Sequence, residues 1–266
     1  MKLLEGKVAI VTGATKAKGL GRAIAVKLAE QGAKVALTGR ASSQEGMQAN
    51  VDAINASGGM AMGILVDLSN PDKIDAAIGE VAEAWGSVDI LVNNAGVGFG
   101  SAIFDENEEK DWEANYNVNV MGTLSMCRAV APYMEKAGGG AIVNVASTAG
   151  IAASAGMPYP YVATKHGLVG ISKVMALEVA ELGIRVNVVA PGAIHTDMLQ
   201  KAYEAIASAG GISVEEAAAA ENASIPMGRP AQPAEIAAAI SFLAGPDASY
   251  ITGIVLPVAG GMAPGI

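Results

Sequence analysis

Short apolar segments alternate with longer helical patterns along almost the whole 266-residue sequence. The apolar, β-branched segments occupy residues 8–12, 35–38, 60–66, 90–93, 141–146, 185–190 and 254–258. Between them lie helical patterns at residues 20–31, 43–56, 71–85, 108–136, 162–182 and 233–243. Strands this apolar, alternating with helices, are typical of a parallel sheet that helices cover on both faces. The sequence therefore predicts an α/β fold: one doubly wound, Rossmann-like domain over residues 1–266, with about seven parallel strands.

One segment departs from this alternation. Residues 198–223 are helical and rich in alanine, and Gly210 and Gly211 interrupt them. The segment follows a strand end and returns before the last helix, so we expect it over the carboxyl edge of the sheet, where ligands bind in open α/β folds. We predict a helical substrate lid at about residues 196–225; ordinary surface helices are the alternative.

Composition excludes several classes of function. Hydrophobic residues make up 52% of the chain and charged residues 16%, which is enough for a large core. The net charge of −9 and the lack of a basic run argue against a nucleic-acid partner. The sequence contains no uninterrupted apolar stretch of about 18 residues, so we expect no membrane span. The first strand begins too early for a signal peptide. We expect a cytoplasmic protein with no membrane partner.

Metal-binding residues are scarce. Cys127 is the single cysteine and lies in an apolar helical stretch, which is typical of a core residue. His166 and His195 are the two histidines, too few to complete a typical zinc site with it. We therefore predict no metal site.

A glycine-rich turn follows the first strand and opens the first helix, from Thr12 to Gly21. Glycines allow a tight turn and a close approach to a pyrophosphate, whose charge the helix N-terminus attracts. The turn predicts a dinucleotide site; an ordinary glycine-containing strand–helix turn is the alternative. The expected contacts are Gly13, Thr15, Lys18, Gly19 and Leu20.

The end of the second strand indicates which dinucleotide binds. NAD sites of this type end that strand with an acid for the ribose 2′-hydroxyl, whereas an arginine accommodates a 2′-phosphate. Here Gly39 stands where the acid is expected, and Arg40 follows it. With Lys18 and Lys16 able to reach from the glycine turn, we expect NADP(H) in preference to NAD(H), bound by Arg40 and Ser42.

Tyr161 and Lys165 form the main catalytic candidate. Residues i and i+4 share one face of a helix, so a phenol and an ammonium lie close together. The positive charge favours the phenolate, and such a tyrosine can exchange a proton with a carbonyl or alcohol oxygen. The pair also occurs by chance in many helices. Tyr159 is a rival phenol, but Ala163 stands four residues on, so we assign Tyr159 to the substrate pocket.

Further motifs are Val66-Asp67-Leu68, Asn93-Asn94-Ala95-Gly96, Asn119 with Gly122, the segment 144–150 around Ser147, and Pro191-Gly192 with Thr196. Together with the glycine turn and the Tyr161–Lys165 pair, they resemble the short-chain dehydrogenase/reductase family over about residues 7–261. The resemblance implies a catalytic set of Asn119, Ser147, Tyr161 and Lys165. Tyr161 would be the acid in ketone reduction and the base in alcohol oxidation, and Ser147 would donate to the substrate oxygen. Lys165 would bind the nicotinamide ribose, and Asn119 would hold a proton-relay water. Further implied cofactor contacts are Asp67, Leu68, Asn94, Ala95, Gly96, Pro191, Gly192, Ile194 and Thr196, besides Tyr161 and Lys165.

The expected substrate pocket is formed by residues 97–99, 151–159 and 194–203, which are mostly small and apolar. We expect Phe99, Met157, Tyr159 and Met198 to line it beside Ser147 and Tyr161. This pocket has no cluster of basic residues, which favours a hydrophobic or cyclic ketone or an acyl chain over a highly anionic substrate.

The resemblance implies an NADPH-dependent carbonyl reductase, or secondary-alcohol dehydrogenase, acting on a ketone or a 3-oxoacyl-type substrate. A sugar, polyol or hydroxysteroid dehydrogenase is an alternative. A non-catalytic NADP-binding sensor is another, although it would be expected to lose Tyr161 or Lys165. The Tyr–Lys spacing of four argues against enoyl reduction. Family members are commonly oligomeric, so a homotetramer or homodimer is expected, through helices 108–136 and 162–182.

Three features depart from the family pattern. The glycine turn is two residues longer, and the interval from Ser147 to Tyr161 is 14 residues, one more than the commonest spacing. Ala259 replaces the usual aspartate before Gly260 and Gly261. We expect the longer turn to alter phosphate contacts and the longer interval to alter the substrate pocket. Ala259 is expected to alter local packing or an interface more than chemistry.

Overall fold

The computed structural model describes residues 2–103, 105–152 and 156–262. Seven parallel strands form one sheet in the order β3-β2-β1-β4-β5-β6-β7. The strands are β1 Val8–Val11, β2 Lys34–Gly39, β3 Met60–Leu65, β4 Ile90–Asn93, β5 Gly140–Val145, β6 Ile184–Pro191 and β7 Val255–Val258. This confirms the predicted α/β class and the parallel, Rossmann-like sheet.

The helices follow the predicted alternation closely. They are α1 Leu20–Glu30, α2 Gln44–Ala56, α3 Ile74–Trp85, α4 Glu109–Tyr116, α5 Thr123–Lys136, α6 Tyr159–Glu178, α7 Asp197–Gly210, α8 Val214–Ser224 and α9 Pro233–Ala244. Two details differ from expectation. A π-helix, Asn117–Gly122, joins α4 to α5, and α6 begins three residues before the predicted start at 162, so that Tyr161 lies in its first turn.

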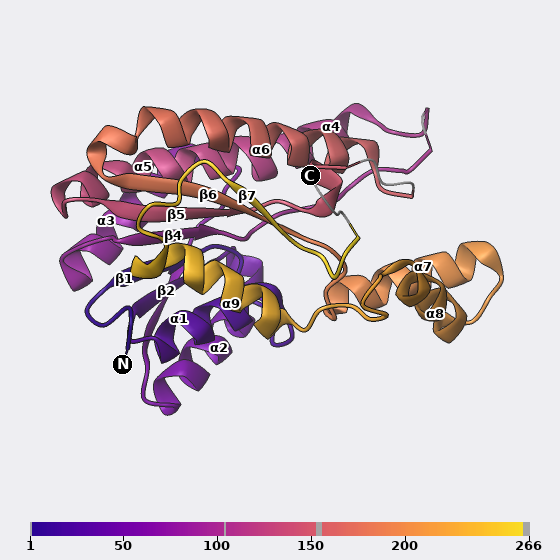
Figure 1. Cartoon of the computed structure of the whole chain (residues 1–266), viewed down its shortest axis with the longest axis horizontal. Coiled ribbons are helices and arrows are strands. Elements are labelled where there is room, and N and C mark those ends of the chain that lie inside the picture. The colour runs from indigo at the N-terminus through magenta and orange to yellow at the C-terminus, as the bar shows by residue number, and fades with distance from the viewer. Residues whose placement is uncertain (1, 104, 153–155, 263–266) are drawn as a thin grey trace.

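The sheet separates two apolar layers. Along β1, Ala9 and Val11 pack into the core beneath α1, α2 and α9, whereas Val8 and Ile10 pack into the core beneath α3 and α5. Figure 1 shows the helices divided between the two faces in this way. Because alternate side chains of a strand point to opposite faces, a strand covered on both sides must be apolar throughout. This explains the uninterrupted apolar segments of the sequence.

The strand order reverses at β1, which lies between β2 and β4. Ligands bind at such a switch point, beyond the carboxyl ends of the strands. Helices α7 and α8 project beyond this edge, away from the sheet layers (Figure 1). The segment from β6 to α7 and the segment from α8 to α9 pair through a bridge between Ile194 and Ala231. None of the helices in the described residues is long and apolar enough to cross a membrane.

Arg185 of β6 connects the sheet to the end of α9. Its Nη1 donates to the carbonyl oxygens of Leu243 at 2.8 Å and Ile251 at 3.3 Å, and its Nη2 donates to that of Gly245 at 3.2 Å. Burial lowers the pKa of this guanidinium. The charge therefore satisfies carbonyls that the last turn of a helix leaves without partners.

We predict that Arg185→Ala lowers the free energy of unfolding by about 2 kcal/mol, because a hydrogen bond to a charged group is worth about 1.5–3 kcal/mol. Arg128→Ala on the exposed side of α5 is the matched control and should change stability little. Urea unfolding of the two variants measures both effects. Equal losses would show that the carbonyl contacts of Arg185 contribute no specific stability.

Candidate active site

Ser147 and Tyr161 meet beyond the carboxyl end of β5. Ser147 caps the short 3₁₀-helix Thr148–Gly150, and its Oγ accepts a hydrogen bond from the Ala149 amide at 3.1 Å. A side-chain hydrogen bond also joins Ser147 to Tyr161. A Cβ on Gly150 would lie 2.8 Å from the carbonyl oxygen of Lys165. The turn that carries Ser147 can therefore approach α6 because residue 150 has no side chain.

Lys165 is almost completely buried, with 4% of its surface exposed. Its Nζ donates to the Val145 carbonyl at 2.9 Å and lies 5.7 Å from the centre of the Tyr161 ring. Burial disfavours the charged form and lowers the pKa of Lys165 to about 8. The site thus holds an ammonium group that is still largely protonated at neutral pH.

The pKa of Tyr161 differs from the expectation drawn from sequence. We expected the neighbouring ammonium to lower it, but the pKa is raised because the phenol is buried, and the hydrogen bond with Ser147 opposes this only in part. Lys165 Nζ donates to the Val145 carbonyl at the end of β5. Burial of the phenol is therefore the dominant influence on its pKa, and Tyr161 keeps its proton.

Asn119 lies in the π-helix and holds the loop after β4. Its Oδ1 accepts from the Val97 amide and its Nδ2 donates to the Val97 carbonyl, both at 2.9 Å. Nδ2 also donates to Thr164 Oγ1 at 3.1 Å. The side chain of Asn119 is therefore occupied by protein partners. Its visible effect is to position the loop against the catalytic residues.

Asn115 assists this loop, and the sequence reasoning missed it. Its Nδ2 donates to the carbonyl oxygens of Phe99 at 3.0 Å and Asp111 at 2.7 Å, and the residue is fully buried. Asn115 lies four residues before Asn119, on the same helical face. That spacing of two asparagines was the signal available in the sequence.

The glycine turn and the loop after β4 are in direct contact. Thr12 Oγ1 accepts from the amides of Asn94 at 3.0 Å and Ala95 at 2.9 Å, and Asn94 Nδ2 donates to the Thr12 carbonyl at 2.9 Å. A Cβ on Gly13 would lie 2.9 Å from Ala95 Cα. Asn94 and Ala95 therefore brace this edge, and Thr12 is a bracing residue that the sequence reasoning left out.

The N-terminus of α1 fits a phosphate group. Gly19 is its N-cap and provides no side-chain cap, so amides of the first turn lack that partner. A Cβ on Gly21 would lie 2.7 Å from the carbonyl oxygen of Gly13, and glycine at this position keeps the turn close to the helix. In the lengthened turn, Lys16 and Lys18 are exposed, and Arg22 Nη1 donates to the Ala17 carbonyl at 3.2 Å.

The ends of β2 and β3 form the next part of the crevice. Arg40 and Ser42 are exposed. The pKa of Asp67 is lowered mainly by hydrogen bonds from the side chain and amide of Ser69, and also by the charge of Arg40. Leu68 is buried against the π-helix, where a Cβ on Gly122 would lie 2.7 Å from Leu68 Cβ. These predicted cofactor contacts thus share one edge with the glycine turn.

The opposite side of the crevice follows β6. Pro191 ends the strand, and the Gly192 amide donates to the Val258 carbonyl at 3.2 Å. Ile194 forms the bridge to Ala231, and Thr196 caps α7. Gly96 completes the arrangement, because a Cβ there would lie 3.3 Å from Lys165 Nζ. The predicted cofactor residues therefore lie on consecutive loops at the carboxyl edge.

The predicted substrate residues are less uniformly placed. Phe99, Tyr159 and Met198 are exposed by 52%, 41% and 62%, and Met157 is half-buried. Of the expected pocket loop 151–159, residues 153–155 lie outside the described residues. Tyr203, the last residue of the expected pocket stretch 194–203, is only 5% exposed and packs with Ala207 and Ala217 between α7 and α8.

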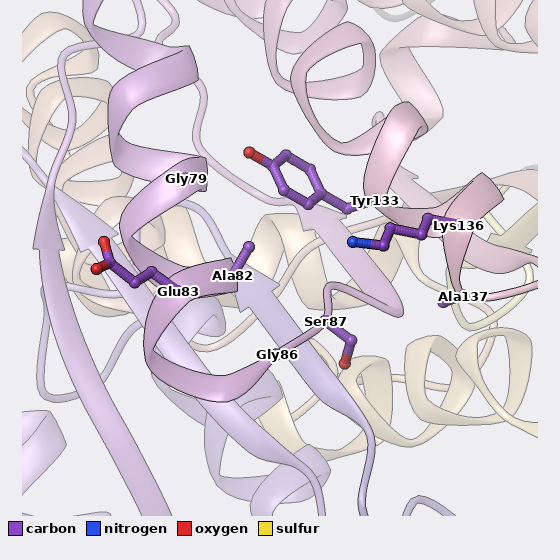
Figure 2. Close-up of a pocket in the computed structure, with 8 residues that line it drawn as sticks. All are labelled: Gly79, Ala82, Glu83, Gly86, Ser87, Tyr133, Lys136 and Ala137. Atoms are coloured by element: carbon purple, nitrogen blue, oxygen red, sulfur yellow. The ribbon is translucent and has the colours of Figure 1, made fainter.

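A pocket of the structure lies away from this edge. It has a volume of ≈ 360 Å³ and lies between α3 and α5 at the amino ends of the strands. Figure 2 shows its lining, with Tyr133 and Lys136 on one side and Gly79, Ala82 and Glu83 on the other. None of the predicted site residues lines it, so the acid–base geometry at the carboxyl edge identifies the site. No group of His, Cys, Asp and Glu in the described ranges is placed to hold a metal ion.

Comparisons with known proteins agree with this geometry. A family model described as Enoyl-(Acyl carrier protein) reductase matches residues 13–263. The 3-oxoacyl-[acyl-carrier-protein] reductase FabG of Vibrio cholerae is 42% identical over 259 residues, which are 97% of this chain and 98% of that protein.

Two solved structures also match over nearly their whole length. Actinorhodin polyketide ketoreductase with NADPH is 36% identical, with a TM-score of 0.91 and 97% of each chain covered. L-Sorbose reductase from Gluconobacter frateurii, complexed with NADPH and L-sorbose, is 30% identical, with a TM-score of 0.92 and 100% of each chain covered. With the Ser147–Tyr161–Lys165 arrangement at the carboxyl edge of its sheet, the chain belongs to the short-chain dehydrogenase/reductase family and is an oxidoreductase that acts on CH–OH and C=O groups.

Proposed function

We propose that this oxidoreductase uses NADP(H) to reduce the ketone of a 3-oxoacyl thioester, with Ser147, Tyr161 and Lys165 as its catalytic residues. The observation that carries this proposal is the buried, protonated phenol of Tyr161 hydrogen-bonded to Ser147. A raised pKa keeps the phenol in the acid form at neutral pH, which is the form that carbonyl reduction requires.

The geometry supports one order of events. The ketone oxygen lies between the hydroxyl groups of Ser147 and Tyr161, which both donate to it. The reduced nicotinamide, when bound, supplies the hydride that the carbonyl carbon accepts. Tyr161 gives its proton to the oxygen, which becomes the alcohol, and the charge of Lys165 stabilises the phenolate that remains. Asn119 acts as a positioning residue, because its side chain is bonded to Val97 and Thr164.

The cofactor is held by the residues at the carboxyl edge. The glycine turn and the N-terminus of α1 would bind the pyrophosphate, and Arg40 with Lys16 or Lys18 would bind the 2′-phosphate. Preference for NADP(H) is supported by the missing acid at the end of β2 and by the NADPH in both similar structures.

The substrate class rests on the relatives and on the lining of the site. The relative from Vibrio cholerae is a 3-oxoacyl-[acyl-carrier-protein] reductase, and one structural neighbour is a polyketide ketoreductase. Phe99, Met157 and Met198 are the apolar side chains that would contact an acyl chain in the expected pocket. A keto-sugar is the second candidate, because the similarity to L-sorbose reductase covers the whole chain.

Assembly, lid movement and location remain predictions. We propose that α7 and α8 form a substrate lid and that the chain forms a homotetramer or homodimer in the cytoplasm. Exposed apolar side chains on the two helical segments expected at the interface support the oligomer: Trp112, Tyr116, Met121, Val174 and Leu177.

The substrate proposal predicts NADPH-dependent turnover of 3-oxoacyl thioesters. The measurement is NADPH oxidation at about 340 nm against a panel of 3-oxoacyl thioesters, cyclic and aryl ketones, keto-sugars and enoyl thioesters, with NADH in parallel. Turnover of keto-sugars alone would replace the substrate class, and turnover of enoyl thioesters alone would overturn the reaction. Binding of NADPH without any turnover would favour the sensor alternative.

The assignment of the acid predicts that Tyr161→Phe lowers kcat by about 10²–10⁴-fold, because the proton donor is lost. Binding of NADPH, followed by fluorescence titration, should change by less than about threefold. Tyr159→Phe is the matched control at the rival phenol. If Tyr159→Phe causes the larger loss of kcat, the proton donor is misassigned.

The buried ammonium predicts a pH-dependent stability. Because burial lowers the pKa of Lys165 from its ordinary 10.5 to about 8, the unfolded chain binds more protons at this residue between those values. Stability contributed by Lys165 therefore rises with pH across this window, and its burial is most unfavourable below about pH 8. Without cofactor, the Tm of Lys165→Met relative to wild type should be highest near pH 7 and should decline toward pH 10.

Lys173→Met, at an exposed lysine of the same helix, is the control and should show a nearly constant difference. A Lys165→Met difference that does not vary with pH would contradict the lowered pKa.

A further inference from the structure

Gly39, the last residue of β2, packs directly against Thr15 of the glycine turn. A Cβ on Gly39 would lie 2.3 Å from Thr15 Cγ2 and 3.3 Å from Ser43 Oγ. The optimal separation of two carbon atoms is about 3.5–4.0 Å. Gly39 is not among the glycines with positive φ. Position 39 therefore lacks a side chain for reasons of space, not of backbone conformation.

The backbone of Thr15 cannot easily move away from this contact. The amides of Gly13 and Ala14 donate to the Thr38 carbonyl at 3.0 Å and 3.2 Å. On the other side, buried Asn50 of α2 donates from Nδ2 to the Ala14 carbonyl at 3.0 Å. The glycine turn is thus held between the end of β2 and the face of α2.

A second glycine, Gly46 of α2, packs against Thr15 from the other side. A Cβ on Gly46 of α2 would lie 2.3 Å from the carbonyl oxygen of Thr15. Helix α2 therefore touches the main chain of Thr15, while β2 touches its methyl group. A side chain introduced at position 39 meets the methyl group of a residue whose main chain is held on both sides.

Position 39 is also where an NAD-type site would carry its acidic residue, at the end of the second strand. We propose that Thr15 is a specificity-determining residue: its methyl group occupies the space that an acidic side chain at position 39 would need. Cofactor choice is then enforced by sterics at Thr15 and Gly39 as well as by the charge of Arg40. This inference rests on the proposed use of NADP(H).

The test is a double-mutant cycle read by cofactor binding, which requires no substrate. The proteins are wild type, Gly39→Asp, Thr15→Ser and the double variant; serine keeps the hydroxyl and removes only the methyl group. Dissociation constants for NADPH and NADH are measured by fluorescence titration. Gly39→Asp alone should weaken both cofactors by about tenfold or more. The double variant should recover NADH binding by about tenfold or more and should prefer NADH.

If Gly39→Asp does not fold, the smaller substitution Gly39→Ala tests the same contact. A Cβ alone already collides with Thr15, so Gly39→Ala should lower the Tm of the cofactor-free protein by about 3 °C or more, and adding Thr15→Ser should restore most of that loss. Additive effects of Gly39→Ala and Thr15→Ser on Tm would overturn the steric inference. A switch to NADH by Gly39→Asp alone, equal to that of the double variant, would overturn it too.

The failure of this inference can be distinguished from failure of the proposed function. If wild type binds NADH more tightly than NADPH, the NADP(H) proposal fails, while the Tm cycle still reports on the contact. Arg40→Ala should weaken NADPH about tenfold or more and NADH little, because the lost charge pairs only with the 2′-phosphate. Suppose that Arg40→Ala loses its preference for NADPH while the Tm effects of Gly39→Ala and Thr15→Ser are additive. The charge of Arg40 would then be the sole determinant of cofactor preference, and the steric inference would fail.

Discussion

Main-chain contact between loops at the carboxyl edge of the sheet is the constraint on which the site depends. The loop after β1 touches the loop after β4 because Gly13 has no side chain, and Thr12 holds the two together through the amides of Asn94 and Ala95. The turn after β5 reaches α6 because residue 150 is glycine. At each contact, a Cβ on the glycine would collide with the neighbouring segment. The loops can therefore come together at this edge only because these positions are glycine.

Buried polar groups then set the chemistry within this frame. Desolvation raises the pKa of Tyr161 and lowers that of Lys165, so burial works against both charged forms. The phenol stays protonated, ready to donate, while the ammonium keeps most of its charge at neutral pH. Asn115 and Asn119 hold the loop that covers these groups. Their amides have protein partners, which is what burial of a polar side chain requires.

Much of the fold could be predicted from the local pattern of apolar residues, because their spacing depends on which faces of each strand or helix are buried. The seven strands and the interruption near Gly210 and Gly211 followed from it. The pairing of Tyr161 with Lys165 also followed, since i and i+4 neighbours depend only on helix geometry. The start of α6 was predicted three residues late. The π-helix was missed, because no periodicity in the sequence distinguishes its turn from an α-helical one.

What the sequence by itself determined was the order of elements, the parallel sheet and the residue types at the strand ends. The tertiary structure decided how those residues interact. It showed that burial raises the pKa of Tyr161, that Asn119 is bonded to Val97, and that Tyr203 packs between α7 and α8. It also brought Thr15 against Gly39, 24 positions apart in the numbering. Desolvation and close packing arise between segments distant in the chain, so local sequence carries no record of them.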